Sequence, residues 1–366
     1  MTTLLQEVRT RDWSAITGRK LFWPLLILVA LMLFNLPFTP NFFAVGVRHG
    51  NLYGSVVNIL NFGAKTVLVA LGMTLVIATG GIDLSVGAVM AIAGAVACKV
   101  ITDAPDQNSL SVVFTAIGLA LAAGAAAGLF NGVMVARAGV QPIIATLVLM
   151  VAGRGIAQLV TDGRVLTESS RPFGRIGGFS FGVPTDVLLV VVLVAATSAL
   201  TRRTAFGLLV EAVGGNSEAS RLAGVRSRRI KLMVYLFCAL CAATAGLVDA
   251  STLPGADANH SGLWIELDAI LAVVIGGTPL TGGRFSIGGT VVGALILQTL
   301  KTTIFTIGIP SQANMVFEAG VVIIICLLQS EDFRDRAAAL VGGRGRGRPA
   351  RVPAGPSEPA SVEVAP

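Results

Sequence analysis

Acidic side chains inside or beside apolar stretches are the residues whose types and positions could support chemistry. Asp83 follows two glycines between apolar segments, Glu266 and Asp268 open a third segment, and Asp249 and Glu318 fall in or near apolar runs. An ionisable residue at membrane depth marks a functional site by default. No paired acid and base and no proton-relay pattern stand out among them. We therefore expect no catalytic residue, and we expect Asp249 and Glu318 to line a cavity.

Motifs for metal, redox or nucleotide chemistry are missing from the sequence. Cys238 and Cys241 form a C-x-x-C pair, but all four cysteines lie in apolar stretches, where cysteine packs as a small apolar residue. The two histidines, His49 and His260, are far apart, so no metal site is expected. No G-x-x-x-x-G-K-[ST] phosphate loop occurs, so this chain is expected to bind no nucleotide or other cofactor.

The composition indicates the surroundings of these residues. Of 366 residues, 54% are hydrophobic and 13% are charged, against about 25% charged in a soluble domain. This low share of charged residues excludes a disordered chain. Too few polar side chains remain to cover a water-facing surface, which argues against a soluble enzyme. The net charge of +7 comes from cations between apolar segments, so membrane topology explains it better than a nucleic-acid partner. The predicted fold is all-α, a polytopic transmembrane helical bundle.

Ten apolar segments can be drawn, and each is predicted to be a membrane-spanning helix, which needs about 20 mostly apolar residues. The segments are 21–36, 56–79, 85–101, 111–136, 143–160, 184–200, 230–250, 266–277, 287–307 and 313–329. The eighth is short, which predicts a tilted or broken helix, and Gly63 and Lys65 suggest an interruption in the second. Gly124, Gly128 and Gly132 repeat every four residues in the fourth, which predicts close helix packing.

The placement of the cations predicts the topology. With the N-terminus inside, 19 of the 27 lysines and arginines fall inside and four fall outside. We expect a cytoplasmic N-terminal segment 1–20, a membrane domain 21–330, and a cytoplasmic, disordered tail 331–366 rich in arginine and proline. The basic part of the tail either lies on anionic lipid or only fixes the topology. The membrane path of 161–183, with a suspected re-entrant turn, stays open.

The longest polar insertion in the membrane domain is the loop 201–231, expected on the cytoplasmic side. Its residues 217–223 predict a short helix with Asn216 or Ser217 as N-cap and Gly224 at its C-terminal end. Three small residues would suit docking into a groove on another protein: Ala219, Ser220 and Ala223. The alternative is an ordinary loop that only sets topology.

Residues 211–225, EAVGGNSEASRLAGV, resemble the cytoplasmic coupling loop of bacterial ABC-type sugar importer permeases of the ribose/xylose/arabinose group. Two further stretches match that family in order: 80–87 (GGIDLSVG), and 266–277 (ELDAILAVVIGG) followed by Gly282-Gly283-Arg284. The stretches 255–259 and 262–264 are most similar to permeases of galactofuranose importers. The resemblance covers roughly residues 20 to 330. Ser220 replaces a usual alanine, and Thr281 stands where larger apolar residues often occur.

The resemblance implies that a short coupling helix in this loop rests on a separate ATPase subunit, which binds ATP and magnesium. It also implies a second permease chain, identical or homologous, and a periplasmic sugar-binding protein. The coupling role is carried over to Glu211, Gly214, Asn216, Glu218, Ala219 and Gly224. Residues of the other motifs either shape turns and cap helices or line the pathway: Gly80, Gly81, Asp83, Ser85, Glu266, Asp268, Gly276 and Gly277.

The expected function is that of the membrane subunit of an ATP-driven sugar importer in the bacterial inner membrane, with no enzyme activity of its own. The first expected sugar is galactofuranose, followed by other pentoses and hexoses, and the candidate contacts are Asn58, Asn61, Asn131 and Trp264. One alternative is an ion-coupled secondary transporter, but neither coupling-ion ligands nor inverted repeats are convincing. Others are an intramembrane enzyme and an ABC permease for branched-chain amino acids.

Overall fold

The computed structural model describes residues 21–39, 41–308, 310 and 313–329. The predictions for the N-terminal segment 1–20 and the tail 331–366 lie outside the described residues. The chain divides into a compact unit of residues 1–325 and a second unit of residues 326–366. Apart from the last residues of one helix, the described elements belong to the first unit.

Each of the ten predicted segments forms a helix. The helices are α2 (Phe22–Phe34), α3 (Ser55–Ala78), α4 (Val86–Thr102), α5 (Leu110–Ala136), α6 (Pro142–Val160), α8 (Thr185–Arg203), α11 (Ser227–Thr252), α12 (Ile265–Ile275), α13 (Ile287–Ile307) and α14 (Asn314–Gln329). Six of the described helices, namely α3, α5, α6, α8, α11 and α13, are long and apolar enough to cross a membrane. The chain is therefore a polytopic helical membrane protein.

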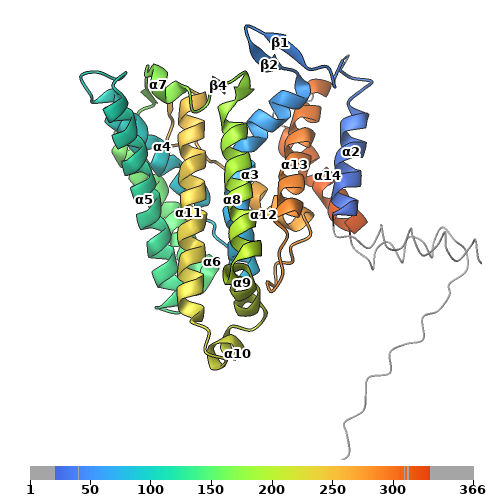
Figure 1. The fold of residues 1–366 in the computed structure, drawn as a ribbon. Helices are drawn as coiled ribbons and strands as arrows, with labels where there is room; N and C mark the ends of the chain where they lie inside the picture. The colour runs from blue at the N-terminus through green and yellow to red at the C-terminus, as the bar shows by residue number, and fades with distance from the viewer. Residues whose placement is uncertain (1–20, 40, 309, 311–312, 330–366) are drawn as a thin grey trace, which may run out of the picture. The chain divides into compact units, whose positions relative to one another are not determined.

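Helix α3 lies at the centre of the bundle (Figure 1). In its most apolar window 78% of the residues are buried, against 17% for α8. It packs against α8, α11, α12 and α13, and α11 in turn packs against α4 and α5. A helix that is apolar all round belongs in an interior. Helices α3, α4 and α11 therefore form the core, whereas α5, α6 and α8 present apolar faces outward.

The glycine stripe of α5 faces α11. A Cβ added at Gly124 would lie 2.5 Å from the Ala243 Cβ, and one at Gly128 would lie 2.6 Å from the Ala239 Cβ. Such distances leave no room for a larger residue, because the two backbones approach closely there. The predicted close packing of this helix is confirmed.

Two features of the predicted helices had different outcomes. The suspected interruption of the second segment is wrong, since α3 runs without a break through Gly63 and Lys65. The Lys65 ammonium lies 2.7 Å from the Asp249 carboxylate on α11, so its charge is compensated inside the bundle. The eighth segment is short, as predicted, because α12 has 11 residues.

Three small antiparallel sheets were not predicted, because strands of two or three residues leave no alternating pattern. They pair β1 (Gly46–Arg48) with β2 (Asn51–Tyr53), β3 (Leu166–Thr167) with β6 (Gly255–Ala256), and β4 (Phe179–Ser180) with β5 (Val183–Pro184). The first pair, β4 and the short helix α7 (Arg171–Gly174) lie at the end opposite α9 (Ala205–Gly215) and α10 (Ser217–Leu222) (Figure 1). The β3–β6 pair joins segment 161–183 to segment 253–264.

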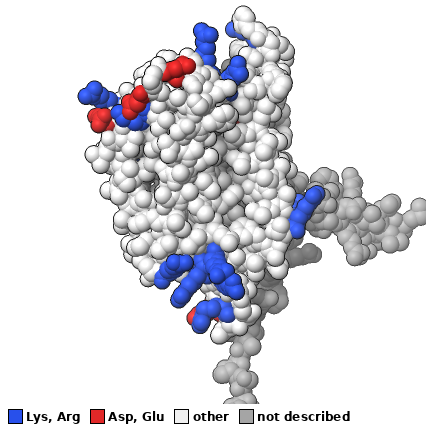
Figure 2. All heavy atoms as spheres, turned by 60° about the vertical axis from the view of Figure 1, so that its left-hand side comes forward, with Lys and Arg blue, Asp and Glu red and all other residues white. Residues whose placement is uncertain are grey.

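Charged side chains differ between the two ends of the bundle. Lysine and arginine gather at the end that carries α10, whereas basic and acidic side chains mix at the opposite end (Figure 2). The loop 201–231 contributes seven of the basic residues. The apolar belt between the ends carries few charged side chains on the face shown, as expected for a surface in contact with lipid.

Candidate functional site

The loop 201–231 folds into two helices rather than an open polar loop. The Asn216 side-chain oxygen accepts hydrogen bonds from the backbone N–H of Glu218 at 3.0 Å and of Ala219 at 2.9 Å. It thereby caps α10, which ends at Leu222, and Gly224 follows with φ of +87°. The predicted short helix, its Asn216 cap and its glycine end are confirmed.

The exposed surface of α10 differs from the predicted one. Ser220 is buried and its hydroxyl donates to the Ala212 carbonyl at 2.9 Å, so the helical phase turns it toward α9. Leu222 is 80% exposed instead, next to exposed Ala219 and Ala223. The predicted face of three small residues is therefore wrong for Ser220, and the outward surface is a leucine between small residues.

An ion pair borders this surface. The Arg221 guanidinium donates to both carboxylate oxygens of Glu218, at 2.7 and 3.2 Å. These hydrogen bonds, and the positive charge of Arg221, hold the pKa of Glu218 below its ordinary value. Glu218 therefore presents a negative charge at neutral pH on the most protruding part of the basic end.

The three sequence stretches that resemble one family meet at one point, here called the glycine junction: Gly80, Gly214, Gly282 and Gly283. Gly214 on α9 lies so close to the end of α3 that an added Cβ would overlap the Ala78 carbonyl oxygen and lie 2.7 Å from the Gly283 nitrogen. The Gly283 N–H donates to that same carbonyl at 2.9 Å. The helix pair α9–α10 is thus in backbone contact with the α3–α4 and α12–α13 connections.

Asp83 organises the turn between α3 and α4. Its Oδ1 accepts from the backbone N–H of Ser85 at 2.9 Å and from the Ser85 hydroxyl at 2.6 Å. The Asn131 amide of α5 donates to the Ser85 hydroxyl at 2.8 Å. All three side chains are buried. This geometry favours the turn-shaping alternative for Asp83 and Ser85, although the Ser85 side chain does not cap α4.

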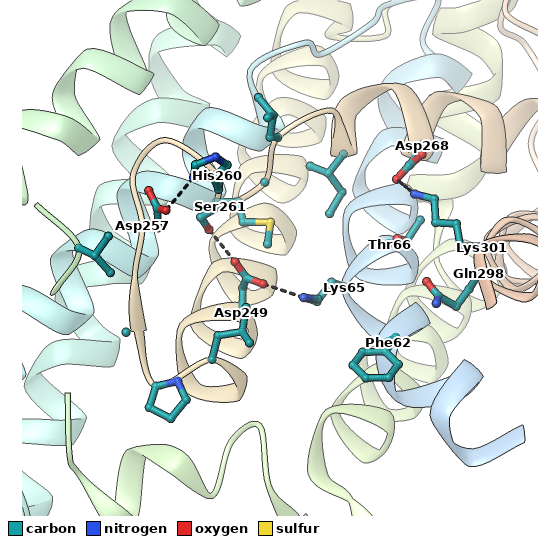
Figure 3. Close-up of a pocket in the computed structure, with 18 residues that line it drawn as sticks. Phe62, Lys65, Thr66, Asp249, Asp257, His260, Ser261, Asp268, Gln298 and Lys301 are labelled. Atoms are coloured by element: carbon teal, nitrogen blue, oxygen red, sulfur yellow. Dashed lines mark hydrogen bonds and ion pairs between the residues drawn. The ribbon is translucent and has the colours of Figure 1, made fainter. Parts of the chain in front are cut away.

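A cavity of about 570 Å³ lies inside the bundle (Figure 3). Helices α3, α11, α12 and α13 and the segment 253–264 supply most of its lining, and the polar lining residues are Lys65, Thr66, Asp249, Asp257, His260, Ser261, Asp268, Gln298 and Lys301. The prediction that Asp249 lines a cavity is confirmed. Glu318 is not among the lining residues, but its carboxylate lies 3.6 Å from the Lys301 ammonium.

Two lysine–aspartate pairs stand on the walls of this cavity (Figure 3). Asp249 accepts from Lys65 at 2.7 Å and, with its other oxygen, from the Ser261 hydroxyl at 2.7 Å. Asp268, in the first turn of α12, accepts from Lys301 at 2.5 Å. Each pair joins two helices, α3 to α11 and α12 to α13. The positive charge of each lysine on the two walls is therefore compensated locally.

The segment 253–264 enters the bundle before α12 begins. Gly262 packs on Gly87 in the first turn of α4, and a Cβ at Gly262 would lie 2.7 Å from the Gly87 carbonyl oxygen. Irregular backbone at membrane depth needs partners for its polar groups. The Arg154 guanidinium of α6 supplies them by donating to the carbonyls of Ala258 at 3.0 Å and Ser261 at 2.6 Å.

The four candidate sugar contacts do not converge. Asn58 is exposed on α3, Asn61 faces the Asp186 carboxylate of α8, and Asn131 is buried beside Ser85. Trp264 is 48% exposed just before α12, with φ of +65°. None of them lines the cavity. The sequence signal for the residues that do line it was the placement of Lys65 and Lys301 inside apolar segments.

The remaining motif residues lie around α12. Glu266 is buried, with its carboxylate next to Gly87. Gly276 packs against the backbone of Gly289 on α13, and Gly277 has φ of +83° in the turn that follows α12. These positions hold the turn between α12 and α13, beside the glycine junction. Glu211, the first of the residues predicted to take part in coupling, is half-buried on α9.

Residues 55–327 match the family model described as branched-chain amino acid transport system / permease component. The chain is 47% identical over 321 residues to the galactofuranose transporter permease protein YtfT of Escherichia coli (strain K12), which covers 86% of this chain and 92% of the relative. It is 39% identical to the fructose import permease protein FruF of Bifidobacterium longum (strain NCC 2705), over 87% of this chain and 90% of the relative. It is 38% identical to the ribose import permease protein RbsC of Escherichia coli (strain K12), over 88% of this chain and 96% of the relative. No solved structure matches this chain.

Proposed function

Because the chain belongs to the branched-chain amino acid transport system / permease component family, and within it to the permeases of ABC-type sugar importers, we propose that it forms the membrane pathway for a monosaccharide. The chain is a transport component and not an enzyme. The observation that carries the proposal is the similarity to sugar permeases along almost the whole length of both chains. This similarity favours a sugar over a branched-chain amino acid as cargo.

The proposed first cargo is galactofuranose, on the basis of 47% identity to a galactofuranose permease. Fructose and ribose follow, because relatives named for them are 39% and 38% identical. A periplasmic binding protein would deliver the sugar to the end that carries the small sheets. A second permease chain, identical or homologous, would complete the pathway.

The proposed topology has ten spans, with α10 and both termini in the cytoplasm. Basic residues at the α10 end support this orientation, since cytoplasmic ends of membrane proteins are enriched in lysine and arginine. Segment 253–264 together with α12 would make up the eighth span. The proposed membrane domain covers 21–330, preceded and followed by cytoplasmic segments.

The proposed contact with the ATPase subunit is α10, which protrudes from the basic end. Asn216 and Gly224 fix the two ends of this helix, and Glu218 and Ala219 lie on its exposed surface. ATP and magnesium would bind in the partner. A displacement of α10 would be transmitted by α9, through Gly214 and the glycine junction, to the α3–α4 and α12–α13 connections.

Reconstitution in liposomes tests this proposal. We expect uptake of labelled sugar only when the chain is supplied with its ATPase, its binding protein and ATP. A secondary transporter would instead take up sugar by itself when an ion gradient is applied. Uptake by the chain alone would therefore contradict the proposed function.

Exchanging the charge at Glu218 tests the contact surface. In Glu218→Arg we expect sugar uptake to fall at least tenfold, because a partner surface that complements Glu218 would face a charge of its own sign, and such a juxtaposition costs several kcal/mol. The side chain is outside the membrane and 72% exposed, so the amount of folded protein should not change. Uptake and ATP hydrolysis are measured on the same reconstituted importer.

The double variant Glu218→Arg with Arg221→Glu is the matched control. It restores the ion pair within α10 but leaves the reversed charge at position 218. If the pair mattered only for the stability of the helix, the double variant would regain uptake. We expect it to stay impaired.

A further inference from the structure

The cavity in the bundle has the size and position of a small-molecule site. Its volume of about 570 Å³ lies within the range of about 300–1,000 Å³ typical of ligand pockets. Val165, Leu253 and Pro254 line it on the side of the loops between helices, away from α10. The proposed coupling mechanism uses none of its polar side chains.

The lining offers both donors and acceptors of hydrogen bonds, which suits a neutral ligand. Lys65 and Lys301 can donate, Asp249 and Asp268 can accept, and each lysine is paired with one aspartate. A monosaccharide presents several hydroxyl groups, and each of them both donates and accepts. Phe62, which is 51% exposed, adds an aromatic face on which the apolar face of a sugar ring can pack.

A free amino acid fits this lining less well. Its carboxylate would need an unpaired cation, but Lys65 and Lys301 are each bonded to an aspartate, at 2.7 and 2.5 Å. Its ammonium would have to compete with His260, which lies 2.7 Å from the Asp257 carboxylate. The chemistry therefore favours a neutral polyhydroxylated ligand.

Gln298 on α13 is the polar lining residue most available to such a ligand. Within the described residues its side-chain amide has no hydrogen-bond partner. A Cβ added at Gly63 of α3 would lie 3.4 Å from the Cβ and the Cγ of Gln298, so the stem of the side chain passes close to that glycine. The amide lies on the cavity wall below Lys301 (Figure 3). An amide without a partner can donate to one sugar hydroxyl and accept from another.

We infer that this cavity binds the monosaccharide directly during its passage, with Gln298 as a contact and the Lys65–Asp249 and Lys301–Asp268 pairs on either side. The inference rests on the proposed function and names the place in this chain where the sugar is held. It adds a binding site within one permease chain to the selection made by the binding protein.

The test uses the complete importer in liposomes, with radiolabelled galactose, fructose and ribose as probes. In Gln298→Leu, which keeps the size of the side chain, we expect uptake of the transported sugar to fall about tenfold, because two hydrogen bonds to a desolvated ligand are lost. ATP hydrolysis stimulated by the binding protein should stay within about twofold of the wild type. Gln298→Glu keeps an acceptor and should retain part of the uptake.

Thr299→Val is the matched control on the same helix. The Thr299 hydroxyl donates to the Leu295 carbonyl of its own helix and does not line the cavity, so both activities should stay near the wild-type values. The inference is overturned if Gln298→Leu transports sugar as well as Thr299→Val does. It is also overturned if uptake and ATP hydrolysis fall together. No uptake of any of the three sugars by the wild-type importer would instead contradict the proposed function.

Discussion

Replacing Gly214 with alanine is expected to lower ATP-driven sugar uptake by about ten- to a hundredfold. A Cβ at this position would overlap the Ala78 carbonyl oxygen, which also accepts the Gly283 N–H. Overpacking of this kind costs about 1–3 kcal/mol. The structure can relieve the overlap only by moving α9 away from the α3–α4 connection. Uptake and ATP hydrolysis by the reconstituted importer measure the effect.

Gly215→Ala provides a control one residue away. A Cβ at Gly215 meets nothing within 4 Å, although both glycines lie at the end of the same helix. The loss of flexibility in the free chain is therefore similar in the two variants, but only Gly214→Ala creates an overlap. Equal uptake by the two variants would show that the glycine junction does not carry the coupling movement.

Replacing Lys65 with methionine is expected to destabilise the folded protein by about 3 kcal/mol. It would leave Asp249 charged inside the bundle with only the Ser261 hydroxyl as a partner, and removing one member of a buried pair costs about 3–5 kcal/mol. We take the lower value because the Lys65 side chain is 23% exposed in the folded protein, so the pair is not fully buried. Thermal unfolding of the purified chain in lipid nanodiscs measures the change.

The double variant Lys65→Met with Asp249→Asn separates stability from binding. Two neutral side chains leave no unpaired charge, so most of the lost stability should return. Uptake should nevertheless stay low, because two of the groups proposed to contact the sugar have changed. If the unfolding temperature of Lys65→Met equals that of the wild type, the pair does not stabilise the bundle.

Local signals explain the part of the fold that the sequence predicted. Each of the ten predicted apolar segments corresponds to one helix between α2 and α14, within a few residues. The cap of α10 was predictable because Asn216 bonds to N–H groups only two and three residues away. The orientation of Ser220 was not, because it depends on how α10 lies against α9.

The candidate site could be predicted only in part. The motifs that supply the glycine junction were recognised one by one, but their meeting depends on contacts between residues far apart in sequence, such as Ala78, Gly214 and Gly283. Lys65 and Asp249 are 184 positions apart, and Asp268 and Lys301 are 33 apart. Asparagines were chosen as sugar contacts by residue type alone, and type alone does not indicate which cavity a side chain reaches.

The pairing of the cavity lysines also bears on the electrical behaviour of transport. Moving one elementary charge across the membrane potential involves about 2.3 kcal/mol per 100 mV. The Lys65–Asp249 pair carries no net charge, so helices α3 and α11 displace no net charge of this pair across the bilayer when they move together. A neutral cargo adds none. The voltage across the membrane should then neither drive nor hinder the movement of this pair with its sugar, in keeping with the proposal that ATP in a partner subunit supplies the energy.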